Sequence, residues 1–339
     1  MSSSHIRKVQ LTGGSTFVVS LPKGWAKSVG LCPGDPLKIS IQPDLSLLIT
    51  YGKTSRREPS KITIDVSTAA IKEDVVREFI ACYLAGYDIM HVKFGKTATE
   101  YRSYLKDVMR RKLIGVEVIE ESADHLAAQC LLGHIEFPIS SALSRMHVMS
   151  LLMYQDAIEA FRNGDYTLAE DVTQRDDEVD RLYFFIVRQL KKAVRDVAMI
   201  REIGLSSARD CLGYRLIAKS MERIADHAAR IAKLVSTLER ISNGEVVKII
   251  SEMSKVSMDA YEKSMSALFK LDVKKANQAI KTVEDVISKE EEAINLILQA
   301  DLKLRTIIGL RLIVESIRRI AEYGTDIAEI VINLSIKQA

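Results

Sequence analysis

The sequence predicts a mainly α protein in which a tandem repeat of three-helix bundles follows a small β-rich unit and an α+β middle domain. Two observations predict the helical part: no proline follows Pro138, and Leu, Ile, Ala, Glu, Lys and Arg repeat there with a period of about 3.6 residues. A third observation predicts the β-rich start, since short strand patterns bounded by glycine and proline turns occupy residues 5–51. Because 339 residues exceed what one core holds, we expect domains at 1–57, 58–137 and 138–339.

The composition is that of a globular protein of the cytoplasm. Apolar residues make up 47% of the chain and charged residues 27%, which excludes a disordered or fibrous protein. The four cysteines are scattered without a CxxC pair, and the N-terminus lacks the apolar segment of a secretion signal, so we expect a cytoplasmic location. No uncharged apolar run approaches the roughly 18 residues of a membrane span, so we expect no direct membrane insertion. The overall charge of +3 is uneven, because residues 1–57 are basic and the remainder is mildly acidic.

Residues 5–51 contain four strand patterns around one short helix. The strand patterns are HIRKVQL, TFVVSL, LKISIQP and SLLITY, and the turns TGGS and CPGDP separate them. Pro22 lies in the first turn of the helix, where proline is tolerated, and Gly30 lies where a C-cap is favoured. A unit of this size buries too little apolar surface to be stable alone, and it has no local cysteine pair. We therefore expect it to form a homodimer.

Residues 61–133 alternate between strand and helix patterns. In order, the patterns are KITIDV, EDVVREFIACYLAGY, DIMHVKF, TEYRSYLKDVMRRKL, GVEVIEE and HLAAQCL. The order βαβαββ in so short a span predicts an α+β layer sandwich, for which we expect a ferredoxin-like fold.

The proline-free region after Pro138 divides into six long helices. Breaks separate them near Asn163-Gly164-Asp165, Gly204, Asn243-Gly244, Leu271-Asp272 and Ala300-Asp301. The segment YRLIAKSMERIADHAARIAKLV at 214–235 aligns without gaps on LRLIVESIRRIAEYGTDIAEIV at 310–331. The six helices are therefore expected to be two copies of three, with repeats at 138–240 and 241–339.

Two helices of the first repeat each carry two carboxylates one turn apart: Asp176 and Asp180 in RDDEVDRLY, and Glu222 and Asp226 in ERIADHAARIA. The second pair is expected on the side of its helix away from the apolar stripe. Four carboxylates from neighbouring helices would supply the hard oxygen ligands that Mg²⁺, Mn²⁺ or iron accept. The alternative is that they are solvated charges, because acidic pairs at this spacing are common on helices. His227 points about 100° away from Asp226 and is expected to pack rather than to act as a ligand.

The motif RDDEVDRLY followed by ERIADHAARIA, with a tandem repeat over residues 138–335, resembles the PhoU family of phosphate-uptake regulators. The resemblance implies metal binding by paired acidic motifs on adjacent helices. The implied ligands are Asp176, Asp180, Glu222 and Asp226. It also implies a regulator of phosphate uptake and phosphate homeostasis that is not an enzyme. The implied partners are the ATPase subunit of the phosphate ABC transporter and a sensor kinase.

The second repeat departs from this acidic pattern. It has Arg318, Glu322 and Ile287 at the positions that correspond to Glu222, Asp226 and Asp180. Glu284 and Glu322 remain as a weaker second site, in which a guanidinium group takes the place of a ligand. A buried arginine would neutralise these carboxylates in place of a metal ion, so we expect weak metal binding there or none.

The N-terminal unit resembles a SpoVT/AbrB-like swapped-hairpin domain. The resemblance lies in Arg7-Lys8-Val9, Val18-Val19-Ser20-Leu21-Pro22-Lys23, Val29-Gly30-Leu31 and Gly34-Asp35-Pro36-Leu37. It implies that two chains interleave into one small β-barrel, and that basic residues on one face contact DNA phosphates. The implied DNA-binding residues are Arg7, Lys8, Lys23 and Lys27. The first hairpin loop lacks the usual basic residue, so a domain used only for dimerisation is the alternative.

Two functions of different class follow from these patterns. The first is a regulator that acts through protein partners and DNA and has a metal-binding carboxylate cluster. The second is a metal-dependent enzyme of the helical bundle, a hydrolase or an oxidase. An enzyme needs a general base or a redox-competent nitrogen ligand near the metal, whereas the motifs supply only carboxylates and one histidine on another face. The sequence therefore favours the regulator.

Overall fold

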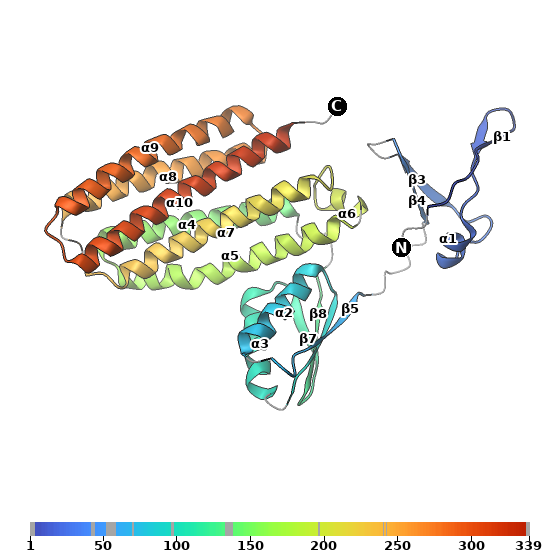
Figure 1. Cartoon of the computed structure of the whole chain (residues 1–339), viewed down its shortest axis with the longest axis horizontal. Helices are drawn as coiled ribbons and strands as arrows, with labels where there is room; N and C mark the ends of the chain where they lie inside the picture. The colour runs from blue at the N-terminus through green and yellow to red at the C-terminus, as the bar shows by residue number, and fades with distance from the viewer. Residues whose placement is uncertain are drawn as a thin grey trace. The chain divides into compact units, whose positions relative to one another are not determined.

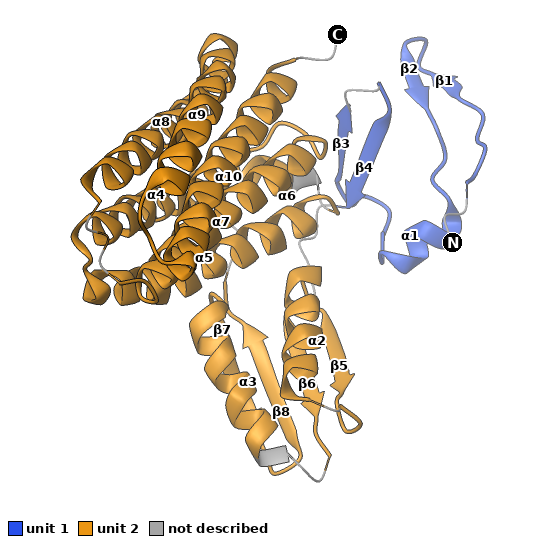
Figure 2. Ribbon diagram, turned by 60° about the vertical axis from the view of Figure 1, so that its left-hand side comes forward, with its two compact units in different colours: residues 1–59 blue, residues 60–339 orange. Residues whose placement is uncertain are grey.

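The computed structural model in Figure 1 describes residues 4–41, 45–51, 59–69, 71–95, 98–132, 138–195, 197–239, 241 and 243–336. The chain divides into two compact units, Met1–Pro59 and Ser60–Ala339 (Figure 2). The predicted domain boundaries after residues 57 and 137 lie outside the described residues, and the division into three domains stays a prediction.

The first unit contains two antiparallel hairpins and one short helix. Its elements are β1 (Gln10–Thr12), β2 (Thr16–Val18), α1 (Lys23–Ser28), β3 (Leu37–Ile41) and β4 (Leu47–Tyr51). β1 pairs with β2 and β3 pairs with β4, in two separate two-stranded sheets. Gly13 and Gly14 turn the first hairpin with φ values of 65° and 81°, a region that glycine enters without a steric penalty.

The β-barrel of the predicted fold is not closed in the part of a single chain that the structure describes. Two short hairpins supply too few strands to cover one another, and apolar side chains stay exposed, including Phe17 at 78% and Ile41 at 73%. A swapped-hairpin barrel takes half of its strands from a second chain, so the interleaved barrel stays a prediction.

The middle region is a two-layer structure whose elements follow the predicted order βαβαββ. The elements are β5 (Lys61–Asp65), α2 (Lys72–Ala85), β6 (Ile89–Lys93), α3 (Ala98–Lys112), β7 (Val116–Glu121) and β8 (His125–Cys130). The four strands form one sheet in the order β5-β6-β8-β7, and the core lies between the sheet and the two helices, where Phe79, Met90 and Leu126 are fully buried.

The expected ferredoxin-like topology is wrong. A ferredoxin-like fold has the order β-α-β-β-α-β, whereas here α2 joins the neighbouring parallel strands β5 and β6, and the β7–β8 hairpin places β8 beside β6. The element order follows from local periodicity, but the strand order depends on which edge of β6 the hairpin joins.

The helical part consists of six long helices and one short one among the described residues. They are α4 (Ile139–Asn163), α5 (Tyr166–Ala193), α6 (Val197–Glu202), α7 (Asp210–Val235), α8 (Gly244–Lys270), α9 (Val273–Gln299) and α10 (Leu304–Ser335). The six predicted helices are confirmed, and α6 is added in the loop before α7. No described helix is both long and apolar enough to span a membrane.

The two repeats share the turn that joins their first two helices. Gly164 and Leu271 each end a helix in the left-handed region, with φ values of 66° and 48°. Asp165 and Asp272 then cap the next helix by accepting hydrogen bonds from its first backbone N–H groups. This shared turn agrees with the predicted repetition of α4–α5 in α8–α9.

The repeats also contact each other through buried polar side chains of α4 and α8. The Ser150 Oγ atom lies 2.8 Å from the Tyr261 hydroxyl group, and the Tyr154 hydroxyl group donates to the Ser254 carbonyl oxygen at 3.4 Å. Tyr154 and Tyr261 are fully buried and lie equally far before the shared turn. Each repeat therefore contributes an equivalent tyrosine to the interface between them.

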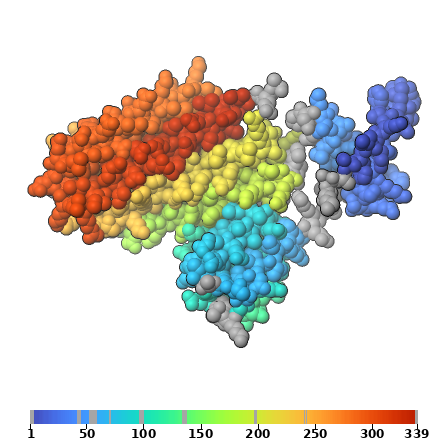
Figure 3. Space-filling view, viewed as in Figure 1, coloured from blue at the N-terminus to red at the C-terminus, as the bar shows by residue number. Residues whose placement is uncertain are grey.

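The middle domain packs on α5, which makes Ser60–Ala339 one compact unit. Both α2 and α3 contact α5, and Figure 3 shows the middle domain in blue and cyan against the yellow-green side of the bundle. The buried Arg188 guanidinium group donates to the Tyr83 carbonyl oxygen at 2.6 Å. The Lys192 ammonium group lies 3.0 Å from the Asp88 carboxylate. Polar contacts thus hold the middle domain along the C-terminal half of α5.

Candidate functional site

The packing of α5 against α7 brings three of the predicted carboxylates together. Asp180, Glu222 and Asp226 each place a carboxylate oxygen within 4.8 Å of the others, and no other group of three acidic, histidine or cysteine residues does so in the described part of the chain. Glu222 and Asp226 meet because they lie one turn apart on α7, and Asp180 faces them from α5. Local helix spacing and one helix contact are enough to build this cluster.

Asp176, the fourth predicted ligand, lies beside the cluster but outside the group of three. The pKa of its carboxyl group is raised to about 7, first by burial and then by the nearby carboxylates of Asp180 and Asp226. Burial disfavours the charged form, and like charges add to that effect. Among the carboxyl groups of this site, Asp176 has the largest rise in pKa, which indicates that nearby cations do not fully balance the negative charge there.

Glu222 lies on the side of α7 away from the apolar stripe, yet only 9% of this residue is exposed. α7 packs against α4, α5 and α10, so more than one of its faces is covered. Burial is the first cause that raises the pKa of Glu222 and of Asp226, although basic neighbours act in the opposite direction. A pattern on one helix cannot show how many neighbours that helix has.

Three basic side chains balance the three carboxylates. Lys219 donates to both carboxylate oxygens of Glu222 at 2.6 Å, and Arg223 donates to Asp226 at 3.1 Å. Lys112, the last residue of α3, reaches Asp180 at 2.9 Å and Asp177 at 3.1 Å. The sequence analysis missed Lys112, because the basic end of α3 is visible in the sequence but its position beside α5 is a tertiary feature.

His227 lies apart from the cluster, as predicted. Its ring centroid is 5.8 Å from that of Tyr323 on α10, and its buried Nδ1 atom has no hydrogen-bond partner in the described structure. Burial, followed by the charge of Arg230, lowers the pKa of His227 to about 4. His227 thus packs against Tyr323 and is not part of the group formed by Asp180, Glu222 and Asp226.

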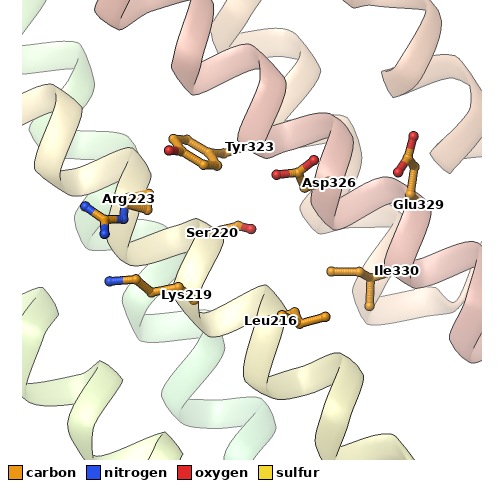
Figure 4. Close-up of a pocket in the computed structure, with 8 residues that line it drawn as sticks. All are labelled: Leu216, Lys219, Ser220, Arg223, Tyr323, Asp326, Glu329 and Ile330. Carbon is orange, nitrogen blue, oxygen red and sulfur yellow. The ribbon is translucent and has the colours of Figure 1, made fainter.

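A hollow of about 380 Å³ lies next to the cluster, between α7 and α10. Figure 4 shows Lys219 and Arg223 on the α7 side of this hollow, with Asp326 and Glu329 on the α10 side. The side chains of Lys219 and Arg223 are one-third to one-half exposed. The counter-charges of Glu222 and Asp226 are therefore in contact with solvent.

The comparison with protein families identifies the helical part. A model of the PhoU domain matches residues 143–235 and 250–331, which together make up more than half of the chain. The chain belongs to the PhoU family. The two matches fall on the two repeats, so each repeat corresponds to one PhoU domain.

Relatives of this PhoU protein come from several bacteria. A "Phosphate-specific transport system accessory protein PhoU homolog" of Clostridium acetobutylicum is 26% identical over 200 residues, which is 58% of this chain and 90% of that protein. A homolog of the same description from Zymomonas mobilis is 22% identical over 57% of this chain and 81% of that protein. The crystal structure of PhoU from Pseudomonas aeruginosa aligns with a TM-score of 0.49 and 20% identity, over 58% of this chain and 94% of that one.

In the second PhoU repeat, arginines occupy the place of the cluster. Glu290 of α9 is 8% exposed and pairs with Arg311 at 3.3 Å and with Arg318 at 3.1 Å. Glu322 accepts hydrogen bonds from Arg318 and Arg319, whereas Glu284 is exposed. Glu284 and Glu322, the two carboxylates of the predicted weaker site, thus belong to no group of three possible ligands among the described residues. The buried carboxylate of this repeat is instead that of Glu290, which could not be identified from the sequence.

The N-terminal unit has a separate relationship. A model described as "Antidote-toxin recognition MazE, bacterial antitoxin" matches residues 10–59. The four predicted DNA-binding residues are exposed: Arg7 and Lys8 precede β1, and Lys23 and Lys27 lie one turn apart on α1. Their exposure leaves them free to contact an anionic partner, and DNA contact stays a prediction.

Proposed function

We propose that this protein regulates phosphate transport and phosphate homeostasis. The observation that carries the proposal is the match of both helical repeats to the PhoU domain, along with relatives that are named accessory proteins of the phosphate-specific transport system. A regulator of this kind acts through partners. The proposed partners are the ATPase subunit of a phosphate ABC transporter and a sensor kinase, met in the cytoplasm.

Deletion of the gene tests this proposal directly. A strain without the protein should lose the normal repression of phosphate uptake when phosphate is abundant, and the intact gene should restore it. The measurement is uptake of radioactive phosphate in phosphate-replete and phosphate-starved cells. Uptake that is unchanged by the deletion under both conditions would contradict the proposal.

The carboxylate cluster is proposed to bind a divalent metal ion, with Asp180, Glu222 and Asp226 as ligands and Asp176 beside them. The donor set fits Mg²⁺, Mn²⁺ or iron, since all ligand atoms are carboxylate oxygens within 4.8 Å of one another. The raised pKa of Asp176 supports the same view, because a cation would relieve the repulsion between buried carboxylates. A bound ion would supply fixed positive charge that draws α5 and α7 together.

The N-terminal unit is proposed to form a homodimer by exchange of hairpins. The exposed apolar side chains of Phe17 and Ile41 support this, because a second copy would cover them. Deletion of residues 1–57 should lower the oligomeric state in light scattering. A truncated protein that keeps the oligomeric state of the full chain would place the dimer interface elsewhere.

DNA is the proposed partner of the basic residues in this unit. Each phosphate contact made by Arg7, Lys8, Lys23 or Lys27 should contribute about 0.9 to the slope of log affinity against log salt concentration. Binding titrations at several salt concentrations, with wild type and with K23A, measure that slope. Absence of a salt-dependent complex at low ionic strength would leave dimerisation as the function of the unit.

A metal-dependent enzyme is the second candidate, and the geometry favours it less. The cluster offers carboxylates, and His227 is held against Tyr323 on another face of α7. Phosphatase and oxidase assays of the protein loaded with Mn²⁺ or Fe²⁺ distinguish the two functions. Turnover that disappears in D180N would favour the enzyme.

A further inference from the structure

The three cations that balance the cluster do not come from the same part of the chain. Lys219 and Arg223 lie on α7, three residues before the carboxylates that they bind, so they move together with Glu222 and Asp226. Lys112 comes from α3 of the middle domain and reaches across to Asp180 on α5. Of these three ion pairs, only that of Lys112 connects the cluster to another layer of the molecule.

We propose that Lys112 is an internal cation that competes with a metal ion for Asp180, so that metal binding and the docking of α3 on α5 oppose each other. The proposal rests on the metal site proposed above. The middle domain then sets the metal affinity of the PhoU repeat, and the metal ion sets how firmly the middle domain is held.

The contacts of Lys112 support direct competition. Its ammonium group bridges two carboxylates of α5, at 2.9 Å to Asp180 and 3.1 Å to Asp177, and the Asp180 side chain is only 16% exposed. Charges beside a largely buried carboxylate are screened less than charges at the surface, so a divalent ion and an ammonium group that share this carboxylate repel each other strongly. A metal ion that uses Asp180 must therefore weaken the Lys112 contact or displace it.

The position of Lys112 makes this contact sensitive to movement of the middle domain. Lys112 is the last residue of α3, and the neighbouring Arg111 adds only a long contact of 3.8 Å to Asp177. Separate polar contacts lie further along α5, where Arg188 and Lys192 meet Tyr83 and Asp88 of the α2–β6 region. Displacement of the Lys112 side chain, which is 32% exposed, would therefore leave these other contacts in place.

The coupling must act in both directions, because linkage between two binding equilibria is reciprocal. If metal binding weakens the Lys112 contact, then that contact weakens metal binding by the same factor, and removing Lys112 should tighten metal binding. Couplings of this kind usually lie in the range of roughly 5- to 150-fold. A ligand or partner that pulls α3 from α5 would have the same effect as the substitution.

The first test is titration with Mn²⁺, followed by electron paramagnetic resonance, of the full-length wild type, K112M and R111M. K112M should bind Mn²⁺ at least about fivefold more tightly than wild type, in line with the coupling range given above. R111M removes the same charge from the adjacent position without a contact to Asp180, and its affinity should change much less. Equal increases in Mn²⁺ affinity in K112M and R111M would overturn direct competition, because any loss of positive charge near the cluster would then explain the result.

The second test uses the wild-type protein and needs no substitution at Lys112. Saturating Mn²⁺ should speed amide hydrogen exchange in the last turn of α3, and D180N should abolish that response. Exchange in α3 that Mn²⁺ leaves unchanged or slows, despite measured binding, would overturn the inference while the metal site stands. Failure of all variants to bind Mn²⁺ would overturn both the metal site and the competition.

Discussion

The two PhoU repeats have the same helical plan but balance buried charge in opposite ways. In the first repeat, α5 and α7 bring together Asp180, Glu222 and Asp226, with cations only at the edge of the group. In the second repeat, α9 and α10 bury Glu290 against two arginines. Several positions separate the two repeats: Arg318 stands in the position of Glu222, and Ile287 stands in the position of Asp180. Together these changes replace a group of three carboxylates with ion pairs between glutamate and arginine.

The largest effect should come from breaking the network of the second repeat. E290Q removes the charge that Arg311 and Arg318 share, and it should lower the free energy of unfolding by about 3 kcal/mol. Arg311 then loses this ion pair, and among the described residues Arg318 keeps only its contact with Glu322. E284Q, at an exposed position on the same helix, should change it by no more than about 0.5 kcal/mol. Urea unfolding measures both, and similar values for the two variants would mean that Glu290 is no more important than a surface charge.

The next largest effect should be a difference in metal binding between variants of the first repeat and variants of the second repeat. The double variant E222Q/D226N should bind Mn²⁺ about 100-fold more weakly than wild type, which corresponds to about 2.7 kcal/mol. The equivalent variant of the second repeat, R318Q/E322Q, should leave Mn²⁺ affinity unchanged. Calorimetric titration measures both affinities. A loss of similar size in the second repeat would show that both repeats contribute ligands.

A smaller effect should appear in the dependence of stability on pH. The pKa of Asp176 is raised from about 3.8 to about 7 in the folded protein, mainly by burial. Ionisation of this carboxyl group therefore costs more free energy in the folded state than in the unfolded state. The contribution of Asp176 to stability is therefore fully present below about pH 4 and is lost as the pH rises from about 4 to 7, by about 2 kcal/mol once solvent screening is considered. D176N should match wild type at pH 4 and exceed it by that amount at pH 8, in unfolding curves measured without metal. Parallel pH profiles of the two proteins would contradict this.

The smallest effect should come from the contact between the repeats. Y261F removes the hydroxyl group that lies 2.8 Å from Ser150, and it should cost about 1 kcal/mol. Y154F removes the longer 3.4 Å hydrogen bond to Ser254 and should cost less. Thermal unfolding of both variants measures the two losses of stability. A larger loss in Y154F than in Y261F would contradict the order expected from the two distances.

The features that could be predicted from the sequence are those that depend on neighbouring residues. Gly164 and Asp165 end one helix and cap the next through their own backbone and side chain, so the helix boundary was predicted correctly. The pairing of Glu222 with Asp226 follows from helix spacing in the same way. The resemblance to PhoU then indicated that Asp180 belongs with them.

The features that could not be predicted depend on how elements meet. The burial of Glu222 follows from the three helices that surround α7, and the contact of Lys112 follows from the docking of the middle domain on α5. Glu290 is one of three consecutive glutamates, and only the rotation of α9 decides which of them is buried. The strand order of the middle sheet also depends on packing, because a hairpin can join either edge of a strand.

The buried tyrosines Tyr154 and Tyr261 each find a hydrogen-bond partner on the other repeat. A three-helix ancestor with one such tyrosine would leave it without that partner until a second copy docked in the same manner, as in a symmetric dimer. Gene duplication and fusion would join such a dimer into one chain without a new interface. In such a fused chain the two halves can differ in sequence, so one half can have carboxylates where the other has arginines.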